Sequence, residues 1–484
     1  MFVDRDADLA EMESRWGLRP QFYLLWGRRR VGKSALVRRF AEGKDAVIYQ
    51  AVTGTATDQL ALLTRRINAW RADAFLEAAP LVSWAQAFAY FERLGRERKA
   101  AAEPLLLVLD EFQYLAASDT SIVSLLADLY ETVKHEGLPL FIIISGSAIG
   151  FFEDEVLVGK LFGRRTGGGL LRPLGYRDAG SFFPDWSAAD RTRAWAVLGG
   201  MPYYLEQFDP GRSLGWNVRE RMLQRNQVLY NEAELLLRDQ LQDPSSYQSV
   251  LAAIAGGATR NSEIAARSGI ATTALSGYLR PLVDLHLVER AVPFGADPAK
   301  SKQGLWTIAD GYLAFWHAFI RPNTVELEAG RADEIWRTVV RPELDRFVSR
   351  PAFEQLCRDY VRERIGRDAR LPASGAVGAW WGSVKTRVDG KPRNVQCEAD
   401  VVAGSRDEVT LVGEAKWSDD DVGLDALKQL RTAAAAVPGT NDQTRLALFS
   451  RTGFEDRLRA VAEQEDVLLF DIEELFDQGD QSAV

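Results

Sequence analysis

The chain has very few of the residues that build disulfide frameworks and zinc sites. Among its 484 residues are two cysteines, Cys357 and Cys397, and three histidines. Two cysteines are too few for a disulfide framework or a zinc ribbon, and a reducing compartment is the natural setting for such a chain. His135 and His286 have no cluster of metal ligands nearby in the sequence, and His317 lies in an aromatic stripe typical of a core. We therefore assign no chemistry to the histidines.

Long apolar runs are missing as well. No segment reaches the length of a membrane span, and the first residues lack the apolar core of a signal peptide. We therefore expect a cytoplasmic protein that does not enter a membrane. Internal repeats and long low-complexity tracts are also lacking, so the domain boundaries have to be inferred from changes in pattern.

The composition is that of an ordinary globular protein, with 46% hydrophobic and 26% charged residues. At 484 residues the chain is too long for a single core. Its net charge of −9 argues against indiscriminate coating of nucleic acid, although a local basic groove is compatible with it.

An eight-residue segment fits the phosphate-loop pattern G-x-x-x-x-G-K-[ST]. It follows an apolar run and leads into a predicted helix, so backbone N–H groups and the helix N-terminus would face phosphate. We expect Lys33 to reach the β- and γ-phosphates of ATP and Ser34 to hold Mg²⁺. The predicted nucleotide-binding residues of this segment are Gly27, Arg28, Arg29, Arg30, Val31, Gly32, Lys33, Ser34 and Ala35.

Two acids end the apolar run 105–109. Strands of a parallel sheet covered on both faces read as continuous apolar runs, and ligands gather at their carboxyl ends. We expect Asp110 to bind in the Mg²⁺ shell and Glu111 to orient and deprotonate the attacking water. This pair indicates ATP hydrolysis and not binding alone.

A third apolar run, 140–144, ends in hydroxyl side chains. Ser145 or Ser147 can sense the γ-phosphate from this position. Further along, Arg164 or Arg165 can neutralise charge on the transferred phosphoryl group, in its own subunit or in a neighbour's. Either arginine can equally be a solvated surface charge.

Changes in pattern predict an α/β chain of five segments. They are a parallel-sheet ATPase core at 1–173, a helical lid at 174–242, a winged helix at 243–325, a helical connector at 326–349 and an α/β domain at 350–484.

The winged-helix prediction depends on the turn at Gly269 between short predicted helices, which is typical of a helix-turn-helix. If the module binds DNA, the third helix presents Thr272, Thr273, Ser276 and Arg280 toward the groove. The alternative is a module that packs on the ATPase or on a partner protein.

The last segment carries a second group of chemical residues. Asp400 lies on an alternating, strand-like run, and Glu414 and Lys416 share one face of the next run. A preceding predicted helix adds Glu354, and Gln429 follows in a later one. Carboxylates that hold Mg²⁺ or Mn²⁺ beside a lysine are what metal-assisted phosphodiester cleavage requires. The alternative is a set of solvated salt bridges.

Several motifs together carry a family resemblance. They are Phe2-Val3-Asp4-Arg5, the loop 27–34, Asp110 to Leu115, Ser145-Gly146-Ser147, Gly163-Arg164-Arg165 and Gly199 to Leu205. With them the chain resembles the prokaryotic archaeal-type ATPases, in the STAND and AAA+ groups of P-loop NTPases. The resemblance implies a P-loop AAA+-like core in which Arg5, Gly200 and Pro202 lie at the nucleotide.

The acid followed by Glu414-x-Lys416 is similar to the PD-(D/E)xK nuclease pattern of restriction-endonuclease-like domains. It also resembles the C-terminal domain of unknown function found in the same ATPase family. Because one chain carries both sets of residues, we expect a protein that binds ATP or ADP and couples nucleotide state to DNA processing by the nuclease-like domain. The alternative is a STAND-type switch that binds a partner protein, or further copies of itself, without cleavage.

Overall fold

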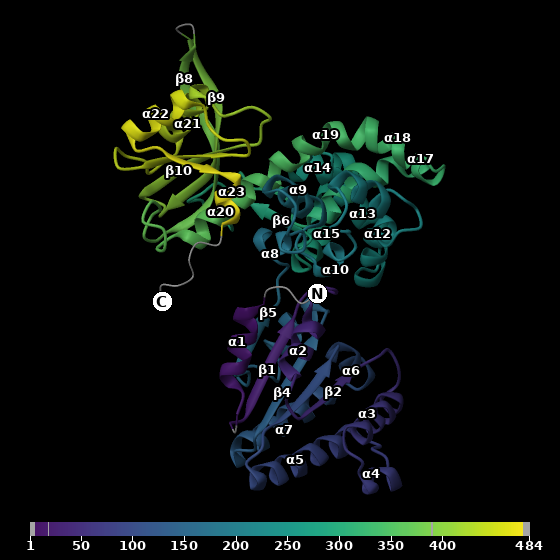
Figure 1. Ribbon diagram of the computed structural model, residues 1–484. Coiled ribbons are helices and arrows are strands. Elements are labelled where there is room, and N and C mark those ends of the chain that lie inside the picture. The colour runs from purple at the N-terminus through teal and green to yellow at the C-terminus, as the bar shows by residue number, and fades with distance from the viewer. Residues whose placement is uncertain (1–4, 18, 389–390, 478–484) are drawn as a thin grey trace. The chain divides into compact units, whose positions relative to one another are not determined.

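A computed structural model of the protein describes residues 5–17, 19–388 and 391–477 (Figure 1). Residues 2–4, which carry part of the family resemblance, lie outside the described residues. The chain divides into two compact units, residues 1–174 with 201–203, and residues 175–200 with 204–484. The five segments that we infer from the sequence stay predictions.

The first unit is built on a five-stranded parallel sheet in the order β2-β3-β4-β1-β5. Its strands are β1 (Gln21–Trp26), β2 (Ala46–Gln50), β3 (Leu105–Asp110), β4 (Leu140–Gly146) and β5 (Gly167–Leu170). The central strands β3 and β4 are buried along their whole length, which is why they read as continuous apolar runs. The sheet confirms the predicted α/β core.

Helices precede and connect the strands of this unit (Figure 1). They are α1 (Asp6–Arg15), α2 (Lys33–Ala41), α3 (Ala56–Trp70), α4 (Ala74–Ala78), α5 (Trp84–Ala101), α6 (Phe112–Ser118), α7 (Ile122–Glu136) and the wide turn η1 (Phe151–Val156). Their apolar faces enclose a core with the strands, in which Phe22, Leu107 and Ile142 are fully buried. The topology brings the carboxyl ends of β1, β3 and β4 to one edge, where the phosphate loop begins.

The second unit opens with helices and a small ribbon. Its helices before the ribbon are α8 (Tyr176–Gly180), α9 (Ala188–Leu198), α10 (Pro202–Leu205, which starts in the first unit), α11 (Leu214–Asn217), η2 (Val218–Met222), α12 (Val228–Gln240), α13 (Pro244–Ala255), α14 (Asn261–Ser268) and α15 (Thr272–Asp284). The strands β6 (Val288–Ala291) and β7 (Leu305–Ile308) pair antiparallel. Gly269 separates α14 from α15 with a φ of +75°, a conformation that favours glycine. The winged-helix assignment stays a prediction.

A run of short helical segments follows the ribbon. They are α16 (Gly311–Phe315), η3 (Trp316–Ile320), η4 (Arg321–Asn323), α17 (Thr324–Glu328), α18 (Ala332–Ile335), η5 (Trp336–Val340), α19 (Arg341–Phe347), η6 (Val348–Phe353) and α20 (Glu354–Arg364). None of the helices in the described ranges is both long and apolar enough to cross a membrane.

The chain ends in a mixed five-stranded sheet in the order β12-β11-β10-β9-β8. Its elements are β8 (Ala376–Val388), β9 (Lys391–Gly404), β10 (Val409–Lys416), α21 (Leu424–Ala436), β11 (Arg445–Ser450), α22 (Asp456–Glu465), β12 (Leu468–Asp471) and α23 (Ile472–Phe476). The strands β8, β9 and β10 pair antiparallel, whereas β10, β11 and β12 are parallel. A mixed α/β sheet is thus present, and its relation to nucleases stays a prediction.

The segment that we predict to be a lid begins with a helix that packs into this C-terminal part. Tyr176 of α8 is fully buried in one core cluster with Phe353 and Phe470. Its hydroxyl donates a hydrogen bond to the Leu475 carbonyl at 2.6 Å. Residues about 300 positions apart in the chain therefore share one core, which is a contact that local sequence patterns do not reveal.

Burial of His317 in η3 leads to a prediction about pH. The side chain is 3% exposed, and neither ring nitrogen has a hydrogen-bond partner among the described residues. Burial, with help from the charge of Arg321, lowers the pKa of His317 to about 3. In the unfolded chain His317 binds a proton near pH 6.5, whereas in the folded chain it stays neutral down to about pH 3. The contribution of His317 to the free energy of unfolding is therefore constant above about pH 6.5 and decreases as the pH falls below that value.

We expect the free energy of unfolding in urea to fall by about 2 kcal/mol between pH 7 and pH 5 through this histidine alone. The His317→Leu variant has no ionisable side chain there, so it should lack this part of the loss. Equal losses in the two proteins would show that His317 is not the group responsible.

Candidate nucleotide site and C-terminal acidic site

The phosphate loop leaves β1 through a backbone that requires glycine. Gly27 has a φ of +153°, and a Cβ placed there would lie 2.5 Å from the Leu171 carbonyl oxygen. Gly32, directly before α2, has a φ of +101°. Both conformations are rarely open to other residues. The loop between β1 and the N-terminus of α2 is therefore shaped by these two glycines.

Lys33 lies inside this loop. Its side chain is buried, and the Nζ atom donates hydrogen bonds to the carbonyls of Gly27 at 2.7 Å and Arg28 at 3.0 Å. Burial lowers the pKa of Lys33, while the nearby carboxylates of Glu111 and Asp110 act in the opposite direction. The loop thus holds an amine at the place where the motif predicts phosphate.

The other loop residues surround this amine. Arg28 is buried, Arg29 is exposed, and Val31 is fully buried. Ala35 lies exposed in the first turn of α2. Their roles in nucleotide binding stay predictions.

Asp110 receives two hydroxyl groups at the end of β3. Ser34 donates to Oδ2 at 2.7 Å, and Ser145 donates to Oδ1 at 2.6 Å. Mg²⁺ in nucleotide sites is bound by one or two such oxygens, by phosphates and by water. The donor chemistry of Ser34 and Asp110 therefore fits the Mg²⁺ that accompanies a nucleotide.

Glu111 is held by side chains of two neighbouring elements. Its Oε2 accepts a hydrogen bond from Ser147 at 2.8 Å and another from Gln113. Gln113 also donates to the Ser147 hydroxyl at 3.2 Å. We did not predict a role for Gln113, although its place two residues after the acid, at the start of α6, is a signal that the sequence contains. Ser145 thus donates to Asp110, and Ser147 donates to Glu111.

Three further side chains border the loop. Arg5 donates a hydrogen bond to the Val31 carbonyl at 3.1 Å. A Cβ built on Gly32 would lie 3.9 Å from Cγ of Pro202. The Arg30 guanidinium stacks over the Tyr203 ring at 4.1 Å from its centroid, a contact that we did not predict. Arg5 and Pro202 therefore lie beside the loop.

Gly200 belongs to the second unit, and its role at the nucleotide stays a prediction.

The two candidate arginines differ in their surroundings. Arg164 forms an ion pair with Glu131 of α7, with Nε and Oε1 2.8 Å apart, and also donates to the Lys160 carbonyl. Arg165 is exposed to solvent. Of the two, Arg165 has the exposure that an arginine acting on a neighbouring subunit needs, whereas the Glu131 pair favours a structural role for Arg164.

The C-terminal residues that we predict to form a site come together on β9 and β10. Val401 pairs with Gly413 in the antiparallel register, which brings Asp400 and Glu414 to adjacent positions on the two strands. Lys416 donates to Glu414 Oε1 at 2.8 Å and to Gln429 Oε1, on α21, at 3.2 Å.

Asp400 is buried beside the first half of α20. Its Oδ2 accepts a hydrogen bond from the Ala415 N–H at 2.9 Å, and its backbone carbonyl accepts one from Arg358 at 2.9 Å. Burial raises the pKa of Asp400, and the nearby carboxylates of Glu354 and Glu414 raise it further. Burial among other carboxylates therefore disfavours the charged form of Asp400.

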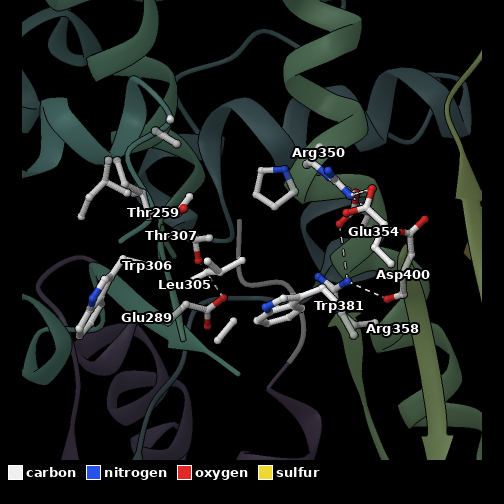
Figure 2. Close-up of a pocket in the computed structure, with 18 of the residues that line it drawn as sticks. Thr259, Glu289, Leu305, Trp306, Thr307, Arg350, Glu354, Arg358, Trp381 and Asp400 are labelled. Carbon is white, nitrogen blue, oxygen red and sulfur yellow. Dashed lines mark hydrogen bonds and ion pairs between the residues drawn. The ribbon is translucent and has the colours of Figure 1, made fainter. Parts of the chain in front are cut away.

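Arg350 is the residue of this site that we did not predict. Its guanidinium pairs with Glu354 Oε1 at 2.6 Å and with Glu398 Oε1 at 2.8 Å, and it lies 3.8 Å from Asp400 Oδ1 (Figure 2). An arginine next to a proline at a helical junction carried no signal that distinguished it from other surface arginines. Only the fold brings it to the acids.

The acids of this cluster suit a metal ion by their chemistry but not by their arrangement. Carboxylate oxygens are the donors that Mg²⁺ and Mn²⁺ prefer, so the chemistry of Glu354, Asp400 and Glu414 is suitable. Within the described ranges, however, no group of three or more His, Cys, Asp or Glu residues has an arrangement that could hold a metal ion. The Arg350 guanidinium lies among the acids instead, so metal binding requires its displacement.

Comparisons with known proteins identify two parts of the chain. Residues 2–208 match the family model of an ATPase domain predominantly from Archaea. Residues 316–430 match the model of a family of archaeal and bacterial proteins of unknown function. An uncharacterized protein of Methanocaldococcus jannaschii is 25% identical over 483 residues, which cover 98% of this chain and 100% of that protein.

Two solved structures are similar in part. A Walker-type ATPase of Pyrococcus abyssi has a TM-score of 0.47 and 21% identity, over 65% of this chain and 96% of that one. The ORC2 protein of Aeropyrum pernix has a TM-score of 0.40 and 16% identity, over 69% of this chain and 92% of that one. The STAND, winged-helix and nuclease assignments stay predictions. The family match of residues 2–208, together with the glycine-shaped loop at the end of β1, shows that the chain contains a P-loop ATPase domain.

Proposed function

We propose that this protein couples ATP hydrolysis to the binding and metal-dependent cleavage of DNA. The ATPase part is supported by Lys33, Asp110 and Glu111, which gather at one edge of the parallel sheet. The cleavage part is supported by one observation above all, that Asp400, Glu414 and Lys416 lie together on β9 and β10 with Glu354 beside them. The five predicted segments are its functional parts.

In the ATPase, Lys33 neutralises charge on the β- and γ-phosphates, and Ser34 and Asp110 hold Mg²⁺. Glu111 orients the attacking water and accepts its proton. Because Ser145 and Ser147 donate to the two acids, they are placed to transmit the presence of the γ-phosphate to both. A free Glu111 requires that its bonds with Ser147 and Gln113 open.

In the C-terminal domain, Asp400, Glu414 and Glu354 would hold Mg²⁺ or Mn²⁺, which would supply Lewis-acid stabilisation of a phosphodiester. Lys416 orients a water molecule near the phosphorus, because Glu414 and Gln429 fix the position of its amine. The ammonium also stabilises negative charge that develops on the phosphate.

DNA binding is assigned to the helices α13–α15 and the ribbon β6–β7. The predicted groove-facing residues Thr272, Thr273, Ser276 and Arg280 are all exposed on α15. Arg280 is 82% exposed and lies 3.9 Å from Asp284, a pairing weak enough to exchange for phosphate. This surface therefore supports contact with a nucleic-acid groove.

The test is cleavage of labelled linear, single-stranded and branched DNA with Mg²⁺ or Mn²⁺, with and without ATP. Cleavage that disappears in the Asp400→Asn variant supports the proposal, and its dependence on ATP shows coupling. Identical rates with ATP, ADP and no nucleotide would rule out coupling. ATP hydrolysis without cleavage of any substrate would rule out the nuclease.

A second function is favoured by Arg350. Because this guanidinium pairs with Glu354 and Glu398 without a metal, the C-terminal domain can be a stable platform that binds a partner protein or a further copy of this chain. The ATPase then acts as a STAND-type nucleotide switch. A Lys416→Ala variant that keeps every activity of the wild type would support this function over cleavage.

Replacement of Arg350 by glutamine should strengthen metal binding. The guanidinium competes with a divalent cation for the same carboxylates, from which it lies 2.6 to 3.8 Å away. At about 4 Å such a competitor has a Coulomb energy of about 4 kcal/mol at the effective dielectric of a protein surface. We expect the Kd for Mn²⁺, measured by titration calorimetry, to fall at least about tenfold.

Arg346→Gln is the matched control, since this arginine of α19 is 86% exposed and pairs only loosely, at 3.5 Å, with Glu343. Its Kd for Mn²⁺ should equal that of the wild type. Weaker Mn²⁺ binding by Arg350→Gln would instead show that the arginine supports the site.

A further inference from the structure

Asp345 of α19 joins separate parts of the second unit by hydrogen bonds. Its carboxylate accepts two of them from the Arg193 guanidinium of α9, at 2.8 Å to Oδ1 and 3.2 Å to Oδ2. The indole N–H of Trp417, which follows β10, donates to Oδ1 at 3.1 Å, and Arg451, which follows β11, donates to Oδ2 at 3.1 Å. One carboxylate therefore connects the segment that we predict to be a lid with the C-terminal sheet.

The same two guanidiniums contact the Trp417 ring. Arg193 and Arg451 lie 5.4 and 5.3 Å from its centroid, within the range of a cation–π contact. Phe353 packs against this ring as well, with the two centroids 5.0 Å apart. The position of Trp417 thus depends on Arg193, Asp345 and Arg451 together, and we call these four residues the Asp345 cluster.

The Asp345 cluster adjoins two of the predicted cleavage residues. Trp417 directly follows Lys416 in the chain, and the Arg451 backbone N–H donates to the Lys416 carbonyl at 3.1 Å. Phe353 directly precedes Glu354. A displacement of the Trp417 side chain therefore acts on the backbone of Lys416 through a single peptide bond.

The cluster depends on the charge of Asp345. Burial raises the pKa of this carboxyl, but hydrogen bonds from Arg193 and Trp417 and the charges of both guanidiniums lower it below its usual value. Asp345 is therefore ionised at neutral pH, and its bonds to the guanidiniums are charge-assisted. Because the two bonds from Arg193 form a fork on one carboxylate, they require one relative position of α9 and α19 and open when either helix shifts.

The other end of α9 leads toward the phosphate loop. Two glycines separate α9 from residues 201–203, which belong to the first unit. Within that unit the Tyr203 ring contacts the guanidinium of Arg30, a residue of the phosphate loop. A change in the loop on nucleotide binding therefore has a covalent path of a few residues to the helix that carries Arg193.

We propose that Asp345 is a positioning residue that couples the nucleotide state of the ATPase to Lys416, with Arg193 on the nucleotide side and Trp417 on the side of the C-terminal site. The fork between Arg193 and Asp345 is the element with two arrangements, closed in one nucleotide state and open in the other, that both sites bias. This proposal rests on the proposed function and adds the regulation of its C-terminal site. The link itself requires no metal ion.

The first measurement is hydrogen–deuterium exchange of the full chain with ADP or with a non-hydrolysable ATP analogue, followed in peptides that cover residues 409–422. We expect deuterium uptake of the wild type to differ between the two nucleotides. The difference should disappear in Arg193→Gln, which removes the guanidinium of α9 and leaves Trp417 and Arg451 on Asp345. It should also disappear in Asp345→Asn, which removes the charge that both guanidiniums share.

Arg451→Gln is the matched control. Arg451 pairs with the same carboxylate and lies at nearly the same distance from the Trp417 ring as Arg193, but it follows a strand of the C-terminal sheet. Its loss weakens the cluster without interrupting the path to α9, so the nucleotide-dependent difference should remain. A cluster with a merely structural role would instead lose the difference equally in both arginine variants.

The second measurement is the ratio of DNA cleavage rates with ATP and with ADP. Couplings between two sites are commonly about 5- to 150-fold, and we expect this ratio to fall to about one in Arg193→Gln. ATP hydrolysis by the same variant should be unchanged, because Arg193 belongs to the second unit and not to the ATPase core.

The proposal would be overturned by deuterium uptake in residues 409–422 that does not respond to nucleotide in the wild type, or that responds equally in Arg193→Gln. An equal loss in Arg451→Gln would overturn it too. Failure of the proposed function has a different pattern: a response that depends on Arg193, without cleavage of any substrate, would retain the link and reject the nuclease. Cleavage with the same dependence on ATP in the wild type and Arg193→Gln would retain the proposed function and reject the link.

Discussion

Replacement of Lys33 by alanine is expected to reduce the ATP hydrolysis rate at least about 100-fold, the usual cost of a preorganised charge that stabilises a transition state. The amine is buried in the phosphate loop and is held by the carbonyls of Gly27 and Arg28. Without it, the β- and γ-phosphates lose the ammonium that the motif places beside them. The measurement is phosphate release under saturating ATP and Mg²⁺.

The matched control is Arg39→Ala. Arg39 lies on the same helix, α2, is 54% exposed and pairs with Glu42 at 2.6 Å on the surface. Its loss should leave hydrolysis within about twofold of the wild type, because an exposed pair contributes little. If Lys33→Ala hydrolyses ATP at the wild-type rate, the assigned nucleotide site is wrong. If Lys33→Ala loses hydrolysis as expected, it also tests whether hydrolysis is coupled to DNA cleavage, because ATP-dependent cleavage should decrease in the same variant.

Replacement of Asp400 by asparagine should reduce DNA cleavage at least about 100-fold, more than the loss of a group that only supports a metal ligand. The asparagine carbonyl can still accept the Ala415 N–H that Asp400 accepts, so the fold is retained while the charge is removed. Cleavage of labelled DNA is measured with Mn²⁺, and ATP hydrolysis in the same samples should be unchanged.

Glu408→Gln provides the comparison for this variant. Glu408 is an exposed acid in the turn between β9 and β10. Its replacement by glutamine removes one negative charge from the same hairpin but does not alter the acidic cluster. It should cleave like the wild type. Full activity in Asp400→Asn would mean that any nuclease activity of the preparation does not come from this site.

The nucleotide site was largely predictable because its chemistry is local. Eight consecutive residues specify the loop, and the glycines at its two ends have backbone conformations that few other residues tolerate. The acids Asp110 and Glu111 follow an apolar strand directly, so their place at the edge of a parallel sheet follows from the strand that precedes them. The partners of these acids were not predictable to the same extent. The Ser147 bond to Glu111 joins the ends of β3 and β4, whose relative positions no local pattern reports, whereas Gln113 lies only two residues from Glu111.

The C-terminal site shows the same division. Alternation along β10 predicted that Glu414 and Lys416 share a face, because side chains of a strand alternate with a period of two. In β9 the pairing with β8 shifts its register between Ala399 and Val402, so a period of two does not place Asp400 there. Alternation could not predict Arg350, which comes from a helical junction. It also did not show that α8, placed in a lid by its helical pattern, shares a core with residues near the end of the chain.

The sequence by itself determined the P-loop, the apolar strands that precede the loop and the acids Asp110 and Glu111, and the set of carboxylates available near the C-terminus. These properties depend on neighbouring residues and on the period of a single element. Tertiary structure alone decided which cation lies among the acids, that Asp345 connects α9 with the residue after Lys416, and how Glu111 is held. Such contacts join side chains far apart in the chain, and their free energy depends on distance and burial, which are defined only once the elements have packed.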